Sequence, residues 1–299
     1  MGLVWALMSP VFLGFIPVTA KFAYSYQVDV YTLAAFRTIF AAALLWVVIA
    51  IWSRQFLVSS YPAMFSSMVA GAINGVGSLF FYASLSRIDA SLGQLINITY
   101  LLFVTILLRL IGQKISTLTV FRMFLAILAI YMLTVGGIQE PDWVGVGLML
   151  VAALSYAIQL VFSQRIMADI PAQTMTLYAM SGMAAVVGLA WLVVWPPISH
   201  VPTAGWTAVL IMGTLTALAR LTLFLGVKSL GSMQTALLGV GEVIVTILVA
   251  MALLGEQLTL IQFFGAILIL VSILLVRYER NIPKFDWWRL IYTKLASRD

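Results

Sequence analysis

One carboxylate, that of Glu242, stands in an otherwise uncharged run from Gly231 to Gly255. About 20 apolar residues are enough to cross the hydrocarbon core of a bilayer. An ionised group at that depth is costly, so it is usually paired, faces a cavity or has a function. Gly239 and Gly241 loosen the helix beside it. The pattern indicates either a site where Glu242 binds an ammonium group or exchanges a proton, or a protonated carboxyl group hydrogen-bonded between helices.

Arg220 is the natural partner of Glu242. At 1.5 Å per residue, Arg220 lies about 12 Å into the membrane from Lys228, and Glu242 lies about 15 Å from Ser232. The two segments are consecutive and antiparallel, so the two charges reach a similar depth. They form either a structural buried ion pair or a site in which Arg220 holds a substrate carboxylate, and holds Glu242 when the site is empty. Such a pair suits a zwitterion such as an amino acid.

Uncharged polar residues follow one face of each of three apolar segments. The members are Asn74, Ser78 and Tyr82 in the first, Gln94 and Asn97 in the second, and Ser155 and Gln159 in the third. Residues spaced by three or four lie on one side of a helix, and polar stripes in lipid must face protein or water. They are either interhelical hydrogen bonds or the lining of a cavity, and three such stripes favour the cavity.

Four further residues of the same region have candidate roles. Pro10 and Gly14 break the regularity of the first segment and would leave backbone carbonyls free for a ligand. Trp5 and Tyr156 could form apolar or cation–π walls of the site, or pack as ordinary core residues.

Two cationic side chains near segment ends are expected to be anchors. Arg37 lies about two turns from its helix end, so we expect its guanidinium to reach the membrane interface. Lys21 ends the first segment and is expected to behave in the same way.

The composition excludes most soluble classes of protein. Of 299 residues, 63% are hydrophobic and only 9% are charged, with a mean hydropathy of +1.11; soluble domains carry about 25% charged residues. There is no Cys, and His200 is the single His, so neither an enzyme nor a metal or other cofactor is indicated. The net charge of +6 comes largely from the tail after Val276, which argues against nucleic-acid binding.

Ten apolar segments approach or exceed the spanning length. They cover residues 2–23, 31–52, 62–86, 90–110, 117–135, 144–166, 172–196, 203–227, 232–254 and 259–277. The first has no basic leader and no cleavage pattern, so we expect a membrane span and not a signal peptide. The connections are short, so consecutive spans must be antiparallel.

The distribution of Lys and Arg predicts the orientation, because cytoplasmic loops carry an excess of both. With a cytoplasmic N-terminus, the other side holds only Lys21 and Arg87. The cytoplasmic side then holds Arg54, Arg109, Lys114, Arg122, Arg165, Lys228, Arg277, Arg280, Lys284, Arg289, Lys294 and Arg298. Both termini are therefore expected in the cytoplasm, in a multi-pass protein of the inner, or plasma, membrane.

The chain also repeats itself. The run 104–107 recurs as 245–248, and 112–116 resembles 255–259. Ten spans split into five plus five, and an odd number per repeat inverts the second half relative to the first, which is a recurrent transporter design. We predict an all-α membrane protein of ten transmembrane helices, with two inverted five-helix repeats, 1–137 and 143–278, around a central cavity, and a basic cytoplasmic tail, 279–299.

Several features recur in a fixed order along the chain: Trp5 and Gly14 in the first span, Lys21 at its end, Arg37 early in the second, the Leu-Leu-Gly-Glu run at 253–256, and the run 265–270 in the tenth. In these features the chain resembles the drug/metabolite transporter superfamily, in its EamA-type ten-helix branch. It departs from the family pattern at Gln113, Tyr100 and Val243. The resemblance implies small-molecule transport without ATP, often export of amino acids or other metabolites.

The leading hypothesis is a secondary transporter that exports small metabolites such as amino acids by alternating access. Its substrate-binding residues would be Glu242, Arg220, Asn74, Ser78, Asn97, Tyr156, Gln159, Trp5, Pro10 and Gly14. The expected partners are a small-molecule substrate, the lipid bilayer and a proton as a candidate coupling ion, with a monomer or weak homo-oligomer as the assembly. The alternatives are an organic-cation or drug transporter anchored by Glu242 alone, and a lipid-handling membrane scaffold.

Overall fold

The computed structural model describes residues 2–110, 117–137, 142–167, 170–198, 200–230 and 240–275. Within these ranges the chain is helical and contains no strand. The repeat motif at 112–116, Gly239 and the basic tail 279–299 lie outside the described residues, and so does the side chain of Trp5.

A helix occupies each of the ten predicted spans. The first half holds α1 (Gly2–Ser25), α2 (Val30–Trp52), a short 3-10 turn (Arg54–Phe56), α3 (Tyr61–Leu85), α4 (Ala90–Asn97), α5 (Tyr100–Leu110) and α6 (Thr117–Val135). The second half holds α7 (Trp143–Ile166), α8 (Ala172–Val194), α9 (Thr203–Leu230), α11 (Val240–Leu254) and α12 (Leu260–Leu274). The part of the ninth span before Val240 is outside the described residues.

Six segments among the described residues are long and apolar enough to cross a bilayer. They are Val30–Trp52, Tyr61–Leu85, Ala90–Leu107, Trp143–Ile166, Ala172–Val194 and Thr203–Gly226, and three shorter apolar helices accompany them. Large hydrophobic side chains remain exposed on the outer helices, among them Phe124, Ile127 and Phe263. The prediction of an all-α membrane protein is confirmed.

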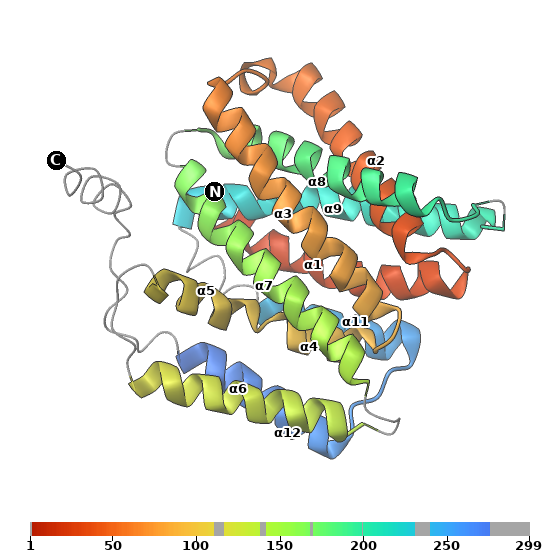
Figure 1. The fold of residues 1–299 in the computed structure, drawn as a ribbon, viewed down its shortest axis with the longest axis vertical. Helices are drawn as coiled ribbons and strands as arrows, with labels where there is room; N and C mark the ends of the chain where they lie inside the picture. The colour runs from red at the N-terminus through yellow and green to blue at the C-terminus, as the bar shows by residue number, and fades with distance from the viewer. Residues whose placement is uncertain are drawn as a thin grey trace.

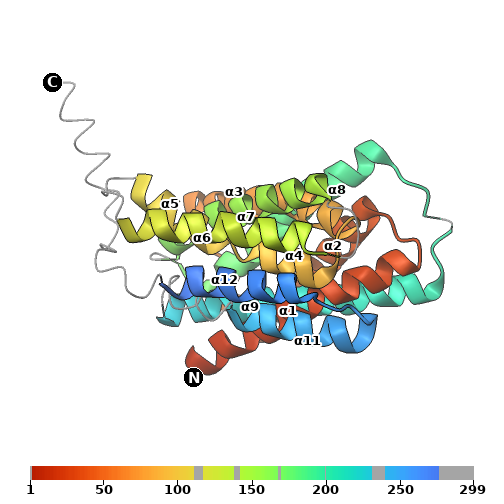
Figure 2. The ribbon, with the colours of Figure 1, turned by 90° about the horizontal axis from the view of Figure 1, so that it is seen from below.

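Each helix of one half has a counterpart in the other half, and counterpart helices make corresponding contacts (Figure 1). Helix α1 packs on α9 and α11, and its counterpart α7 packs on α3 and α5. Helix α2 packs on α9, as α8 packs on α3, whereas α2 pairs with α8 and α6 pairs with α12. The α6–α12 pair lies at the lower edge of the bundle in Figure 1 and faces the viewer in Figure 2, which is seen from below. This is the packing expected of an inverted repeat, although the exact limits of the halves stay a prediction.

Helices α3 and α8 cross with their backbones in direct approach. A Cβ atom at Gly71 of α3 would collide with the backbone of Ala179, and one at Gly182 of α8 would collide with the backbone of Met68. Small residues allow this closeness, which is a common way to join helices in a membrane. The Gly71–Gly182 crossing therefore joins the first half to the second through direct approach of the two backbones.

The predicted break in the first span is wrong, because α1 continues through both Pro10 and Pro17. Gly14 instead allows α1 to approach α11: a Cβ there would lie 2.7 Å from Val245, and the Thr246 hydroxyl donates to the Gly14 carbonyl at 2.9 Å. The hydroxyl also donates to the carbonyl of Glu242 at 3.0 Å. Gly14 therefore acts in helix packing beside the site.

The fourth span holds the discontinuity that we expected in the first. Helix α4 ends at Asn97 and α5 begins at Tyr100. The Thr99 hydroxyl donates to the carbonyl of Ile96 at 2.7 Å, a local bond that competes with the helical ladder. Broken helices in membrane transporters occur where the backbone lines protein or a cavity.

Polar contacts tie the loops together on the side predicted to be extracellular. The Glu256 carboxylate accepts from the backbone N–H of Ala90 at 2.8 Å and of Ser91 at 2.9 Å, and so caps α4 from the other half. Arg87 pairs with Asp142 at 2.8 Å. The Glu256 contact joins the second half to the start of α4, and the Arg87–Asp142 pair joins the segment after α3 to the N-terminus of α7.

Candidate functional site

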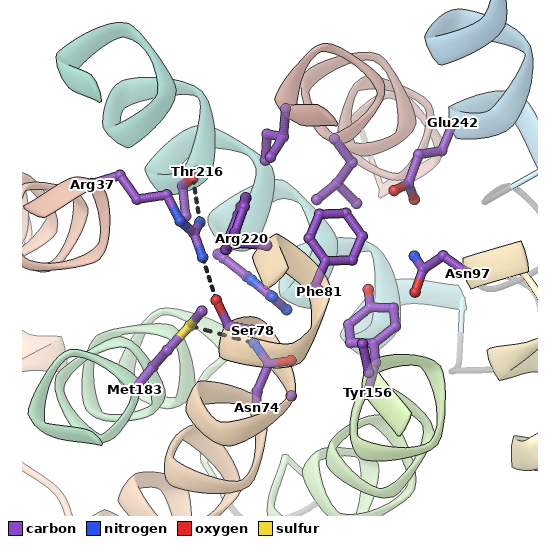
Figure 3. A pocket seen from close by; sticks show the side chains of 15 residues that line it. Arg37, Asn74, Ser78, Phe81, Asn97, Tyr156, Met183, Thr216, Arg220 and Glu242 are labelled. Carbon is purple, nitrogen blue, oxygen red and sulfur yellow. Dashed lines mark hydrogen bonds between the residues drawn. The ribbon is translucent and has the colours of Figure 1, made fainter. Parts of the chain in front are cut away.

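A cavity opens among helices of both halves, and we call it the central cavity (Figure 3). The space among its alpha-helical walls that no protein atom fills is about 570 Å³, a figure that includes open solvent. It is lined by Leu13, Ile16, Arg37, Asn74, Gly77, Ser78, Phe81, Tyr82, Asn97, Ala152, Tyr156, Met183, Thr216, Arg220 and Glu242. Three of these side chains are charged, and the polar ones come from six different helices.

Glu242 lies on α11 at the edge of the central cavity and is 7% exposed. Its carboxylate accepts a hydrogen bond of 2.7 Å from the side-chain amide of Gln94 on α4. The other polar atom of that amide, Gln94 Oε1, is buried without a hydrogen-bond partner among the described residues. Gln94 therefore joins the broken fourth span to the buried acid, a role that the sequence did not single out.

Arg220 lies on α9 and faces the same cavity. Its Nη1 donates to Gln159 Oε1 at 3.3 Å, and its guanidinium lies 5.4 Å from the centre of the Tyr156 ring. Among the described residues the one ion pair within 4 Å joins Arg87 and Asp142, so the expected pair of Arg220 with Glu242 in an empty site is wrong for this conformation. The two charges face the cavity from separate sides, with Phe81 between them in Figure 3.

Arg37 is the residue that the sequence interpretation misplaced. Its side chain does not reach the membrane interface but is 3% exposed and lines the central cavity. Nη1 donates to the Thr216 hydroxyl at 3.0 Å, Nη2 donates to the Ser78 hydroxyl at 2.8 Å, and the guanidinium lies 4.4 Å from the centre of the Tyr82 ring. Its partners come from two other helices, α3 and α9, which cover the side chain.

The polar stripes reach the cavity only in part. Asn74, Ser78, Asn97 and Tyr156 line it, as proposed. Asn74 Nδ2 contacts Met183 Sδ at 3.4 Å, a weak acceptor that leaves the amide available to a ligand. Gln159 lies behind the cavity wall and contacts it through Arg220.

Two other expected residues do not line the cavity. Pro10 and Gly14 lie on α1 beside α11, where Pro10 approaches Gly241 and Gly14 approaches Val245. Their helix still borders the site, because Leu13 and Ile16 of α1 are in the wall. No cluster of three His, Cys, Asp or Glu side chains that could hold a metal ion occurs in the described part of the chain.

Among the lining residues that sequence reasoning missed, Thr216 is the one with a signal in the sequence. Thr216 precedes Arg220 by one turn on α9, so a polar residue and a charge share one face there, as in the stripe of α3. Phe81 and Met183 gave no signal, because apolar residues on apolar helices do not reveal which of them face a cavity. Arg37 could have been found only by knowing that Ser78 and Thr216 meet it.

A bundle of apolar helices in two exchangeable halves, with a polar cavity between them, defines a class of polytopic membrane transporters. The family model described as the EamA-like transporter family matches residues 1–135 and 143–278, so the chain belongs to that family. The protein is therefore a multi-pass membrane transporter, and the resemblance inferred from the sequence is confirmed.

Two similar proteins extend the comparison. The chain is 25% identical over 319 residues, 95% of each protein, to an uncharacterized transporter of Synechocystis sp.. A crystal structure described only as that of a protein aligns with a TM-score of 0.65 at 16% identity, covering 92% of this chain and 99% of the other. The second likeness concerns the fold alone.

Proposed function

We propose that this membrane transporter is a secondary transporter that exports small metabolites such as amino acids by alternating access. One observation carries the proposal: Arg220 and Glu242 line the same cavity without bonding to each other. A cation and a carboxylate that are separated in this way complement the carboxylate and ammonium of a zwitterion. The direction of export rests on the family, in which export of such metabolites is frequent.

Alternating access is supported by where the cavity lies. Its wall is shared by α1, α2, α3 and α4 of the first half and by α7, α8, α9 and α11 of the second. A movement of one half against the other would therefore change every side of the site. The expected inner-membrane location, cytoplasmic termini, proton coupling and a monomeric or weakly oligomeric state remain predictions of the sequence.

The organic-cation alternative is less well supported by the cavity. Its lining contains two guanidinium groups and one carboxylate, so a cationic substrate would meet a net positive site. A lipid-handling scaffold would not need three charges around one cavity, two of them buried, because a charge in the membrane is costly.

The test is counterflow in proteoliposomes with labelled amino acids and labelled organic cations. We expect exchange of amino acids by the wild type and none above background by Glu242→Gln, because the amide cannot pair with an ammonium group. Glu256→Gln is the matched control: it makes the same chemical change outside the cavity and keeps an oxygen that accepts from Ala90. Thermal melting confirms that each variant is folded. Exchange of cations alone would overturn the amino-acid assignment.

A further inference from the structure

We propose that the substrate carries two acidic groups and one ammonium group, as an aminodicarboxylate does, and that Arg37 binds the second acidic group. This inference rests on the proposed function and names the substrate class of the same site. It follows from a cation that the sequence interpretation assigned to the membrane interface and that the structure places in the cavity wall.

The bonding capacity of Arg37 is only partly used. A guanidinium has five N–H donors, and the hydrogen bonds of Arg37 within the described residues are those to Thr216 and Ser78. Its Nε is buried and has no hydrogen-bond partner there. Both acceptors are neutral hydroxyl groups and the third neighbour is the ring of Tyr82, so none of them compensates the charge.

Arg37 and Arg220 are near neighbours. Thr216, which accepts from Arg37, is one helical turn from Arg220 on α9, and side chains four residues apart on a helix lie about 5–6 Å from each other. Two like charges at so short a separation repel each other. Figure 3 shows both guanidiniums on the Ser78 side of the cavity, with Glu242 and Asn97 on the other. Placing two positive charges side by side away from water costs free energy, and no described residue supplies an anion next to them. An anionic group of the substrate between the two guanidiniums would lower that cost.

The charges of the lining select among substrates. Two guanidiniums and one carboxylate leave the cavity with one net positive charge when Glu242 is ionised. A neutral amino acid pairs with Arg220 and Glu242 and leaves Arg37 without an anion. An aminodicarboxylate has two carboxylates for the two guanidiniums and an ammonium for Glu242, so every charge on both sides has a partner.

The remaining lining fits the same ligand. Asn74 and Asn97 supply amide donors and acceptors on either side of the space. Phe81, Leu13 and Ile16 supply apolar surface for the short carbon chain that joins the acidic groups. Sites of this kind combine an apolar wall with a few placed polar groups.

The deciding experiment compares glutamate with glutamine in counterflow, because the two are nearly identical in shape and differ in the second acidic group. We expect the wild type to exchange glutamate at least about tenfold faster at limiting concentration, since a hydrogen-bonded charge pair is worth that much or more. In Arg37→Gln, the ratio of glutamate exchange to glutamine exchange should fall to about one, because the group that distinguishes the second acidic group from an amide is removed. Arg54→Gln, the same substitution at an exposed residue outside the cavity, should keep the wild-type ratio.

Each outcome is informative. Equal exchange of glutamate and glutamine by the wild type would overturn the inference and leave the proposed function in place. Equal loss of both substrates in folded Arg37→Gln would show a structural arginine and overturn it as well. No exchange of any amino acid would overturn the proposed function itself. If Arg37→Gln does not fold, the wild-type ratio still decides, and Ser78→Ala, which removes one bond that orients the guanidinium, should lower that ratio.

Discussion

Gln94 is the described residue that stabilises the buried acid, and it does so from a different half of the molecule. Its amide nitrogen lies 2.7 Å from Glu242 Oε1. A buried carboxylate that loses its donor is left with the cost of its removal from water. The position of Gln94 on α4, immediately before the break of the fourth span, places this bond at the border of the central cavity.

We predict that Gln94→Leu lowers the free energy of unfolding by about 1.5–3 kcal/mol, because it leaves a charged group without its hydrogen-bond donor. Thermal melting in detergent measures the effect, and counterflow should fall with it. The control is Thr105→Val in the neighbouring α5, which removes a buried hydroxyl whose bond, to Leu101, stays within its own helix. An equal loss in both variants would mean that any buried polar group matters as much as the bond to Glu242.

For single residues, the sequence predicts which charged side chains belong to the site better than it predicts which groups they contact. Glu242 and Arg220 were found because charges in apolar runs are rare and costly, and both line the cavity. Depth along a helix can be counted from residue numbers, so their similar depth could be expected. Direction around the helix axis depends on the neighbours, and for this reason Arg37 was assigned to the interface although it is buried against Ser78 and Thr216.

Among the elements, α3 and α8 approach each other closely through Gly71 and Gly182. We predict that Gly71→Ala destabilises the protein by about 1–3 kcal/mol, the usual cost of an added group in a packed interface. A shift of the melting temperature in detergent is the measurement.

Gly147→Ala of α7 is the control for this prediction, since a Cβ at Gly147 meets nothing within 4 Å. Alanine is a better helix former than glycine, so this variant should melt at the wild-type temperature or slightly above. Wild-type melting of Gly71→Ala would contradict the direct contact of the two backbones.

The start of α7 has its own charge-dependent stability. The Gly145 N–H donates to the carboxylate of Asp142 at 2.8 Å, and together with Arg87 it holds the pKa of Asp142 below its ordinary value. A lowered pKa means that the folded state gains stability above the ordinary pKa of 3.8 and loses that gain as the pH falls through the lowered value.

We therefore predict that Asp142→Asn melts below the wild type at about neutral pH, and that the two curves converge in acid, below the lowered pKa. Melting curves across that range measure the difference. In an Arg87→Gln background the difference should shrink but persist, because the bond from Gly145 remains. A difference that is the same at all pH values would exclude a contribution from the charge.

The presence of a helix in each span could be predicted, because it depends on hydropathy and length. Each of the ten spans contains a helix, since a membrane leaves helical backbone as the simplest way to satisfy every N–H and carbonyl group. The position of the discontinuity was not predictable. Two prolines failed to interrupt α1, whereas the fourth span breaks at Ile98 and Thr99 without a proline or glycine. Where a helix is interrupted depends on how it packs against neighbouring helices, and a single sequence does not show that packing.

For the whole molecule, the distribution of basic residues makes an orientation testable. The chain has no cysteine, so single cysteines can be labelled without background. We predict that Ser25→Cys, exposed at the end of α1, reacts with a membrane-impermeant maleimide in intact cells, and that Ser60→Cys, exposed before α3, reacts only after lysis. The reverse pattern would invert the topology.

The two-half architecture was predictable because five spans per repeat and the basic loops lead to it together. The way the halves meet was not, since it depends on which faces pack. Only the structure shows which helices correspond in their packing: α1 packs on α9 and α11, and its counterpart α7 packs on α3 and α5.

The Gly71–Gly182 crossing has a mechanical consequence. Side chains such as Asn74 and Met183 also meet between these helices, but at the crossing itself the two backbones cannot come closer. Because the crossing lies within both helices and not at their ends, a rocking movement about it would separate α3 and α8 on one side of the membrane and close them on the other. In the alternating access that we propose, this contact would serve as the pivot.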